Sequence, residues 1–519
     1  MLDLADLLAR GYFPRELPPP FTTQPYSEIL KKKQGSLPSE FDPSNKNIIS
    51  KPVVHNFTRP GSLRRKFSIP NPLNFYQLAK ILTQEWMYFF KHCDKSQISL
   101  SKPTIKTDGE RAIERLYTLG DLPQHRAKVR ATSRYILQTD IATFYPSVYT
   151  HSIPWALHTK TKSKANRTEK LIGNLVDRII RNSQDGQTIG IPIGPDTSLL
   201  IAETINSVID VSLSKYSDQN GYRYMDDFEF GFNNYAEAEL MLAKLQELLN
   251  DFELQLNPKK TRIFELPEPL ENPGIVELRN FPFRGKHASS QEHDLIHYFT
   301  RAFQLVKSYP DQGILRYAVS RLNYDEITEN NRSFFQNLLL QCATTDPGTL
   351  PFVIEQLKRF SEKSYEIDND TLKATLNKIL VTHAPLGHGG EAAWALWGFL
   401  LFSIQIDDAV ANKLILSEDD IVAILVLDAK EKGLISNNVN FKFWQSLMKV
   451  DELRDKHWLL AYEANIKGWL PTASGNDHVD LEPGFSFLKK NDVYFYDDEL
   501  STTYTSKKPI GPPIRWMGY

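Results

Sequence analysis

The chain has little cysteine and no long run of apolar residues. Its 519 residues include two cysteines, Cys93 and Cys342, which excludes a disulfide scaffold and a four-cysteine zinc site. The longest apolar stretch, around residues 392–404, is shorter than the roughly 20 residues that a membrane-spanning helix needs. The N-terminus lacks a basic start followed by an apolar run, so we expect no signal peptide and no membrane partner. These absences favour a cytoplasmic globular protein.

Charge is nearly balanced overall but unevenly distributed, with a formal net charge of −2. Residues 1–139 hold 22 Lys and Arg against 12 Asp and Glu, which leaves 39 against 51 in the rest of the chain. A basic front part suits a polyanionic partner such as nucleic acid or nucleotide phosphates, although a solvated surface explains the excess equally well. The acidic remainder argues against a protein that coats DNA along its whole length.

The sequence pattern changes twice along the chain. Residues 14–72 are rich in proline and polar residues, which predicts an extended arm with few regular elements. The predicted order β–α–β–β–α–β between about residues 134 and 264 is that of a split βαβ palm. Beyond it, amphipathic helix pairs recur roughly every 40 residues, within the range of HEAT-like arrays. The sequence thus predicts an α+β fold, with a fingers and palm domain at 1–285 and an all-α helical-repeat domain with an irregular tail at 286–519.

Two adjacent aspartates, Asp226 and Asp227, lie between alternating aromatics in YRYMDDFEF (222–230). Adjacent carboxylates are poor strand formers and repel each other unless a cation neutralises them, which predicts a tight hairpin turn. Asp140 interrupts an apolar strand upstream, where a buried charge needs a partner or a metal. Taken alone, a polar turn and a solvated edge strand explain these residues. Together on neighbouring strands, they would create an oxygen-rich site for Mg²⁺.

Four segments in order resemble the reverse transcriptase family. They are TDIATFY (139–145), GIPIGPDTS (190–198), YMDD (224–227) and LNPKKTRI (256–263). The resemblance implies the fingers and palm of a reverse transcriptase and DNA polymerase activity, a nucleotidyl transfer that uses two Mg²⁺ ions. It also implies that Asp140 and Asp226 are catalytic metal ligands, that Asp227 supports them, and that the backbone carbonyl of Ile141 completes the coordination.

The same resemblance implies a nucleotide site next to these carboxylates. Phe144 and Tyr145 follow the catalytic strand, and Tyr145 matches the bulky ring that clashes with a ribose 2′-OH and so favours deoxynucleotides. An ordinary core tyrosine is the alternative for Tyr145. Pro192 and Gly194 belong to the loop that shapes the floor under the nascent base pair, where glycine permits close backbone approach.

Several cations are candidates for contacts with the triphosphate. Lys259 or Lys260 matches the general acid that protonates the departing pyrophosphate, and the sequence does not choose between them. Arg134 lies just before the catalytic strand, where fingers residues of the family grip the triphosphate. Arg126, Lys128 and Arg130 precede it in the same region, and all four cations could equally form a solvated strand face.

Three parts of the chain resemble one branch in particular, the bacterial abortive-infection (AbiK-like) reverse transcriptases of the phage-defence group. They are the loop at 190–198, the segment 143–158 and the helical part that begins near residue 285. This resemblance implies template-independent synthesis from dNTPs, primed by a tyrosine of the protein, so that the single-stranded DNA product stays covalently attached. It also implies a homo-oligomer and a phage or host protein as trigger. Ile193 replaces a glutamine that helps to place the templating pair in many reverse transcriptases, which puts strict template copying in doubt. Tyr12 and Tyr26, near the N-terminus, are the candidate priming residues, and packing of the N-terminal arm onto the palm is the alternative for both.

Two other functions stay open at this point. A conventional RNA-templated, retron-like enzyme is disfavoured because the chain has no cysteine-rich endonuclease module and no clear basic thumb after residue 265. An inactive polymerase-like scaffold is disfavoured because the three carboxylates are intact. His388 and Glu391 share a predicted helix face, but without a third ligand they are interpreted as a capping or packing pair.

Overall fold

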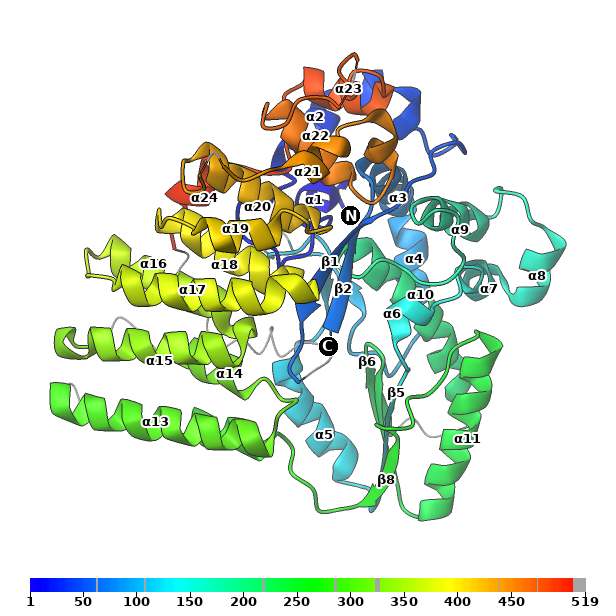
Figure 1. Ribbon diagram of the computed structural model, residues 1–519. Coiled ribbons are helices and arrows are strands. Elements are labelled where there is room, and N and C mark those ends of the chain that lie inside the picture. The colour runs from blue at the N-terminus through cyan, green and yellow to red at the C-terminus, as the bar shows by residue number, and fades with distance from the viewer. Residues whose placement is uncertain are drawn as a thin grey trace.

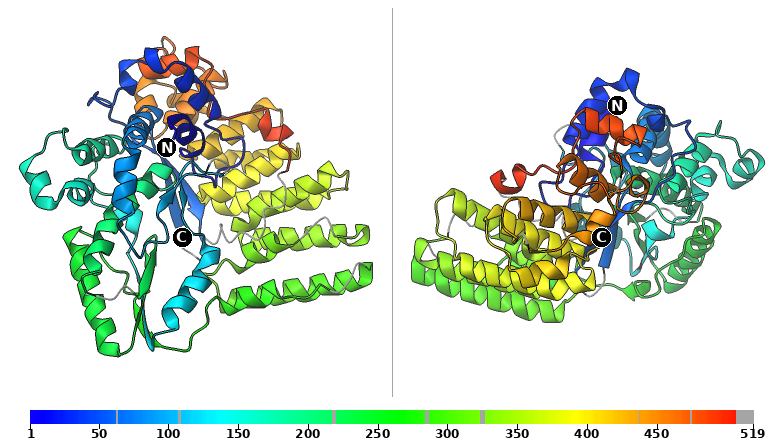
Figure 2. Two further views of the ribbon diagram at one scale, coloured as in Figure 1. Left: turned by 180° about the vertical axis from the view of Figure 1, so that it is seen from behind. Right: turned by 45° about the horizontal axis from the view of Figure 1, so that its top comes forward.

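The computed structural model describes most of the chain, and Figures 1 and 2 show its arrangement. The described residues are 1–61, 64–106, 109–216, 220–283, 287–322, 327–436, 438–473 and 475–506. Within these ranges, no helix combines the length and the apolar character needed to cross a bilayer. An α+β part is followed by a largely helical C-terminal region, as the sequence predicts.

A four-stranded antiparallel sheet lies at the centre of the α+β part. Its strand order is β6–β7–β5–β8, with β5 (Tyr135–Asp140), β6 (Gly221–Tyr224), β7 (Asp227–Phe232) and β8 (Arg262–Glu265). β5 pairs with both β7 and β8, so that Leu137 faces Phe230 on one side and Ile263 on the other. The helix α11 (Tyr235–Asp251) packs against β5 and β7, and α10 (Asp196–Leu213) packs against α11. The buried strand β5 therefore ends in Asp140, between two partner strands.

Shorter elements surround this sheet. A second antiparallel pair, β1 (Val53–Thr58) and β2 (Arg64–Ile69), forms the hairpin beside the C-terminal helices in Figure 1, and β3 (Pro103–Thr104) pairs with β4 (Glu114–Arg115). Short 3₁₀ turns lie at Gln34–Ser36, Ser39–Phe41 and Leu119–Asp121. The remaining helices of this part are α1 (Leu4–Arg10), α2 (Gln24–Lys32), α3 (Pro72–Gln84), α4 (Trp86–Cys93), α5 (Leu122–Arg130), α6 (Phe144–Ser147), α7 (Ser152–His158), α8 (Lys160–Ala165) and α9 (Ile172–Asn182).

The C-terminal region is built of helices that stack beside the hairpin β1–β2 (Figure 1). The stretch predicted as an irregular tail contains two of them, α23 and α24. Short 3₁₀ turns lie at Glu329–Asn331, Pro347–Thr349, Ala384–Leu386 and Val450–Arg454. The helices are α12 (Pro273–Arg279), α13 (Ala288–Ser308), α14 (Ile314–Arg321), α15 (Arg332–Thr345), α16 (Leu350–Glu362), α17 (Asn369–His383), α18 (Gly389–Leu401), α19 (Asp408–Leu414), α20 (Asp420–Glu431), α21 (Lys442–Ser446), α22 (Trp458–Ile466), α23 (Pro483–Lys490) and α24 (Leu500–Thr503).

The N-terminal segment is not the extended arm that its composition predicts. It contains α2, β1 and β2, and its backbone pairs with the C-terminal region: the amide of Thr22 donates to the carbonyl of Phe495 at 3.0 Å, and the amide of Asp497 donates to Pro20 at 2.8 Å. The prediction failed because local composition does not show that a distant part of the chain supplies an apolar surface for the few large side chains of this segment.

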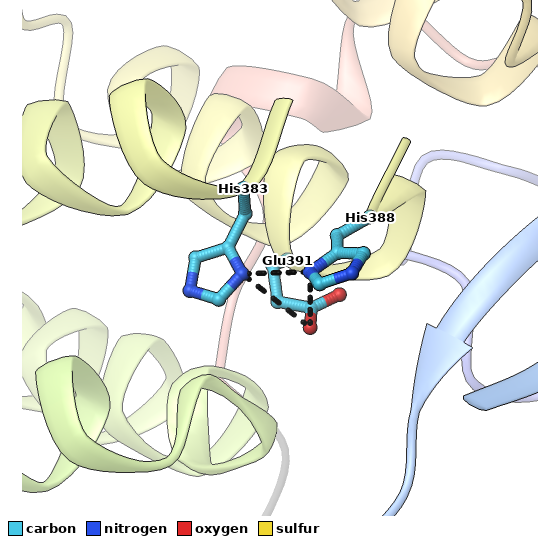
Figure 3. Close-up of side chains that lie close together, drawn as sticks. All are labelled: His383, His388 and Glu391. Carbon is cyan, nitrogen blue, oxygen red and sulfur yellow. Dashed lines mark hydrogen bonds and ion pairs between the residues drawn. The ribbon is translucent and has the colours of Figure 1, made fainter. Parts of the chain in front are cut away.

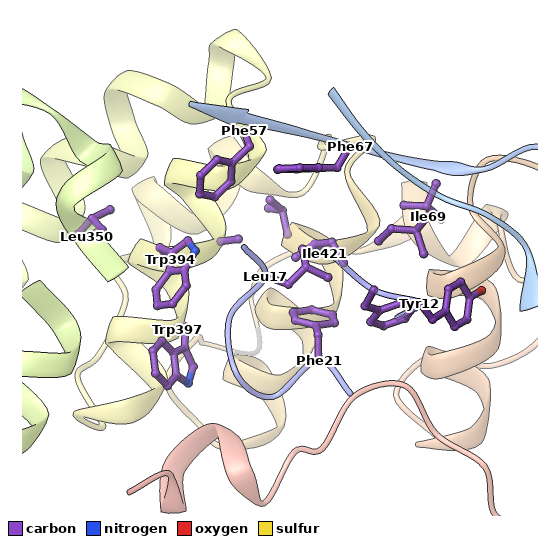
Figure 4. Close-up of a cluster of buried hydrophobic side chains, with 14 of the residues drawn as sticks. Tyr12, Leu17, Phe21, Phe57, Phe67, Ile69, Leu350, Trp394, Trp397 and Ile421 are labelled. Carbon is purple, nitrogen blue, oxygen red and sulfur yellow. The ribbon is translucent and has the colours of Figure 1, made fainter. Parts of the chain in front are cut away.

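One apolar cluster joins the N-terminal segment, the hairpin and the C-terminal helices (Figure 4). Tyr12 and Phe21 pack there near Ile69 of β2, and Trp394 and Ile421 contribute from α18 and α20. Such a shared core ties the two predicted domains together. The predicted boundary at residues 285 and 286 lies outside the described residues, so the division itself stays a prediction.

Candidate active site

Three carboxylates meet where β5 ends beside the β6–β7 turn. Asp140 is the register partner of Asp227, and Tyr224 pairs with Asp227 across the hairpin, which leaves Met225 and Asp226 at the turn. The amide of Ile141 donates to the carbonyl of Asp226 at 3.1 Å, so the backbone joins the turn to the strand end. The sequence expectation that Asp140 and the aspartate pair lie on neighbouring strands is thus met in the sheet pairing.

The turn is held in a costly conformation by buried polar groups. Met225 has φ of 58°, in the left-handed region that a residue with a side chain seldom adopts. Its carbonyl accepts hydrogen bonds from Arg223 at 2.7 Å and Asn206 at 3.1 Å, and its amide donates to the Ser101 hydroxyl at 2.7 Å. Three side chains from β6, α10 and the segment before β3 therefore fix the backbone that presents Asp226.

Arg223 is itself anchored by two buried carboxylates of α10. Its guanidinium is fully buried and donates to Glu203 at 2.8 and 3.0 Å, and to Asp210 at 2.7 Å. The hydroxyl groups of Ser99 and Ser101 donate hydrogen bonds to the same Glu203 carboxylate. Because every group of this network has partners, the charges can be buried without being lost to protonation.

The carboxylates at the turn are crowded and poorly solvated. Burial raises the pKa of Asp226, and the charge of Asp140 raises it further. The pKa of Asp227 lies well above its usual range, first through burial and then through the charge of Asp226. Burial opposes the charge of Lys260, but its hydrogen bond to Asp140 and the charges of both other aspartates raise the pKa of this ammonium. A cation is thus favoured at this place.

This arrangement fits a divalent metal site. Lys260 Nζ lies 2.7 Å from Asp140 Oδ2, whereas the buried Asp140 Oδ1 has no hydrogen-bond partner among the described residues. An unpartnered carboxylate oxygen beside two further carboxylates is a donor set that hard divalent cations bind. Ile141 directly follows Asp140 at the strand end, and the role predicted for its carbonyl remains a prediction.

Lys259 and Lys260, which the sequence did not distinguish, differ in position. Both are exposed, but Lys260 makes the ion pair with Asp140, whereas the backbone amide of Lys259 donates to the Asn257 side chain. The general-acid prediction therefore passes to Lys260.

Tyr145 lies close to the carboxylates. Burial raises the pKa of its hydroxyl, and the charges of Arg115, Glu203 and Asp226 also act on it. Its carbonyl accepts a hydrogen bond from the amide of Ile191 at 2.9 Å. This bond joins α6 to the loop at residues 190–198, called the Gly/Pro loop below. Phe144 is buried and packs edge-on against Tyr145, with 5.7 Å between the ring centroids, so it supports the neighbouring ring from within the core.

The Gly/Pro loop is enclosed by two segments. Gly194 has φ of 130°, and a Cβ there would lie 2.6 Å from Pro14 Cγ of the N-terminal segment. On the hairpin side, the amide of Ser68 in β2 donates to the carbonyl of Ile193 at 2.9 Å. Arg111 donates to the carbonyl of Gly194 at 2.9 Å, while Pro192 is buried. Glycine is required at 194 by both its backbone angle and the contact with Pro14.

The structure corrects the prediction for Arg134 and the cations before it. Arg134 precedes β5 and makes an exposed ion pair with Glu265 at 2.8 Å, so the strand separates it by about 20 Å from Asp140 at the other end. Arg126 and Arg130 belong to helix α5, together with Lys128, and both pair with the carboxylate of Glu229. Arg126 and Arg130 therefore join α5 to β7. Arg134 lies at the opposite end of β5 from Asp140, because the direction of the strand decides which end of the sheet a residue occupies.

Two other arginines interact with residues of the β6–β7 hairpin. Arg65 on β2 is half-buried; burial, with the charge of Arg59, lowers its pKa to about 10, and it interacts electrostatically with Asp226. Arg115 on β4 donates to the Tyr224 hydroxyl at 3.3 Å, and its Nε has no hydrogen-bond partner among the described residues. The run of basic residues at 64–66 signals Arg65 in the sequence, but nothing local distinguishes Arg115.

The candidate priming residues are also corrected. Tyr12 and Tyr26 are fully buried, and their hydroxyls donate to the carbonyls of Pro70 and, at 2.7 Å, Pro72. Burial raises the pKa of both hydroxyls well above the usual range. Neither oxygen is exposed to a nucleotide in this conformation, because the segment that carries them packs into the shared core.

One protein family matches the part of the chain that contains this site. Residues 49–293 match the family described as "Reverse transcriptase (RNA-dependent DNA polymerase)". A search of curated proteins found no match. Among solved structures, apo telomerase from Candida tropicalis aligns with 13% identity over 70% of each chain and a TM-score of 0.32. Telomerase from Candida albicans with a fragment of telomeric RNA aligns with 10% identity over 69% of this chain and 65% of that chain, with a TM-score of 0.29.

Proposed function

We propose that this protein is a DNA polymerase of the reverse transcriptase type, because residues 49–293 match that family, and that it makes DNA from dNTPs without copying a template. The observation that supports polymerisation best is the meeting of Asp140, Asp226 and Asp227 at the end of β5, with one buried carboxylate oxygen left without a partner. Enzymes of this family depend on divalent metal ions. Asp140 and Asp226 would hold two Mg²⁺ ions, with support from Asp227 and the Ile141 carbonyl.

The residues of the chain have distinct roles in the proposed reaction. A hydroxyl group gives up its proton to solvent and its oxygen attacks the α-phosphorus of a dNTP; a new P–O bond forms, and the bond to pyrophosphate breaks. When bound, the Mg²⁺ ions neutralise charge on the phosphates. Lys260 carries an ammonium proton that can pass to the pyrophosphate oxygen. Arg65 and Arg115 bind the anionic triphosphate, and the ring of Tyr145 excludes a ribose 2′-OH.

Two features support synthesis without a template. Ile193 cannot provide the amide of the glutamine that it replaces, and its carbonyl is engaged by Ser68 of β2. Pro14 of the N-terminal segment packs against Gly194, at the loop that would otherwise lie under a templated base pair. Both features reduce the room and the polar groups available for placing a template base.

Protein priming follows from the same resemblance to abortive-infection enzymes. A tyrosine hydroxyl can attack the α-phosphorus as a sugar hydroxyl does, and it leaves the DNA covalently attached to the protein. Because Tyr12 and Tyr26 are buried, we propose another tyrosine as the primer, to be located by mass spectrometry of the peptide–nucleotide adduct.

The decisive experiment uses purified, nuclease-treated protein with labelled dNTPs and Mg²⁺ but no template. Denaturing gels before and after protease treatment show whether the label travels with the protein. Covalent label in the wild type and in Asp251→Asn, an exposed aspartate at the end of α11, but not in Asp226→Asn, is the expected result. Label that depends on added primed RNA would instead identify a conventional RNA-templated enzyme. Absence of label with and without template would favour an inactive scaffold.

We further propose that the activity serves defence against phage, as a homo-oligomer that a phage or host protein triggers. Bacteria that carry the wild-type chain should give fewer plaques than bacteria that carry Asp226→Asn, with both proteins present at equal levels. Equal plaque counts across a broad phage panel would remove the defence role and leave the polymerase assignment intact.

A further inference from the structure

Three metal-ligating side chains converge at the junction of α17 and α18, outside the polymerase site (Figure 3). His383 is the last residue of α17, His388 caps the start of α18, and Glu391 lies in its first turn. The sequence showed the pair of His388 and Glu391 without a third ligand. The turn between the helices, Ala384–Gly387, brings His383 back to that pair.

The distances between the three ligand atoms match a metal site. Nδ1 of His383 lies 2.9 Å from Nδ1 of His388, and each nitrogen lies 3.8 Å from Glu391 Oε1. The point equidistant from these three atoms is about 2.1 Å from each, which is the length of zinc–nitrogen and zinc–oxygen bonds. A cation at that point would therefore lie at bonding distance from all three ligand atoms.

The two imidazoles already have a lone pair available for a cation. A hydrogen bond between two Nδ1 atoms requires that one of them is unprotonated and accepts. A cation replaces the proton on this line; the ring that carried it on Nδ1 takes up a proton from solvent at Nε2, so both imidazoles stay neutral ligands. His383 and His388 remain partly exposed, so a metal ion and its departing water molecules have a route to the site.

Surrounding groups hold Glu391 in place. Its carboxylate is 2% exposed, and Oε2 accepts a hydrogen bond from Arg64 Nη2 at 2.6 Å, while Arg64 also contacts Oε1. Arg64 is fixed in turn by Asn56 of β1, whose side-chain and backbone oxygens both accept from it at 3.1 Å. Hydrogen bonds of this kind orient a ligating carboxylate. The negative charge of Glu391 also offsets the repulsion between the Arg64 guanidinium and the proposed cation.

The glycines of the HGGE segment explain how the site reaches the hairpin. A Cβ on Gly389 would lie 1.9 Å from Asp419 Oδ2 and 3.0 Å from His55 Nδ1. A Cβ on Gly390 would lie 2.4 Å from Phe57 Cδ2 on β1. The first turn of α18 therefore packs directly on β1, which places Glu391 within reach of Arg64.

We propose that His383, His388 and Glu391 bind one zinc ion, or a similar divalent transition metal, with a fourth position open to water. Two imidazoles and a carboxylate suit zinc, whereas Mg²⁺ prefers oxygen ligands alone. The site would brace the hairpin against the C-terminal helices through Arg64. Because Arg65, the next residue, interacts electrostatically with Asp226, the metal also steadies one wall of the proposed nucleotide site.

Metal content of the purified full-length protein tests this directly. The protein is dialysed against Zn²⁺ and then against zinc-free buffer, and zinc is measured by inductively coupled plasma mass spectrometry. We expect about one zinc per chain in the wild type and in His151→Gln, a control histidine that pairs with Asp177. His383→Gln and His388→Gln should lose it while their circular dichroism stays unchanged. Zinc retained in either variant, or absent from the wild type, would overturn the proposal.

A second measurement needs no variant, so it keeps the test decisive if the histidine variants misfold. Cobalt replaces zinc in such sites, and bound Co²⁺ with two imidazole ligands gives strong visible absorption that Co²⁺ in water lacks. We expect one equivalent of Co²⁺ to produce this spectrum in Asp226→Asn as well as in the wild type, and excess Zn²⁺ to abolish it. No spectral change on adding Co²⁺ would refute the site, whatever the state of the polymerase centre.

Discussion

Arg223 offers the most informative perturbation of the active-site hairpin. Its guanidinium is fully buried between Glu203 and Asp210 and donates to the carbonyl of Met225 at 2.7 Å. Replacing it in Arg223→Met leaves two carboxylates buried without a cation, which costs about 3–5 kcal/mol. For a domain of this size, that loss lowers the midpoint of thermal unfolding by roughly 6–20 °C. Arg134→Met, which removes an exposed ion pair, should leave the midpoint of thermal unfolding close to that of the wild type.

A compensated variant separates stability from positioning. The triple variant Arg223→Met, Glu203→Gln and Asp210→Asn removes the unpaired charges, so most of the lost stability should return. It does not restore the hydrogen bond to Met225, and the turn that presents Asp226 stays under-supported. We therefore expect nucleotide incorporation to remain well below wild type, with a lower kcat and little change in KM.

Differential scanning fluorimetry and steady-state incorporation measure these two effects. The reasoning would be refuted if Arg223→Met unfolded at the wild-type temperature, because the charges would then not depend on this arginine. It would also be refuted in part if the triple variant regained full kcat, because the contact with Met225 would then have no positioning role.

Three further predictions follow from other parts of the molecule. Arg65→Ala should raise the KM for dNTPs and lower kcat/KM by about tenfold or more, since a charged hydrogen bond contributes about 1.5–3 kcal/mol, whereas Arg134→Ala should stay near wild type in the same assay; equal losses would contradict the assignment of Arg65. Burial raises the pKa of Glu463 to about 8, so the native state holds a proton that the unfolded chain releases near pH 4.5. The free energy of unfolding should therefore fall by up to about 1.4 kcal/mol per pH unit as the pH rises between these values. Urea titrations of Glu463→Gln should show no such decline. Parallel curves for the two proteins would exclude that effect. Tyr12→Phe and Tyr26→Phe should keep covalent labelling with dNTPs, because both hydroxyls are buried on backbone carbonyls; loss of label in either, with the fold intact by circular dichroism, would return that residue to the role of primer.

Local sequence was sufficient for the parts of the fold that local interactions determine. The order of strands and helices from Asp140 to β8 could be predicted because periodicity, the turn at Asp226 and the glycines of the loop are all encoded within a few residues. The N-terminal segment could not be predicted in this way. Its composition is that of a loop, and its helices and buried tyrosines depend on an apolar surface supplied by α22, α23 and their neighbours.

The sequence by itself determined the chemistry of this protein, and the tertiary structure decided which side chains take part. Asp140, Asp226 and Asp227 could be predicted because they lie in segments that, in their order along the chain, resemble the reverse transcriptase family. The choice of Lys260 and Arg65, and the addition of His383 to His388 and Glu391, needed the three-dimensional structure. Such contacts join residues whose separation along the chain carries no information about distance in space, because only the packing of strands and helices brings them together.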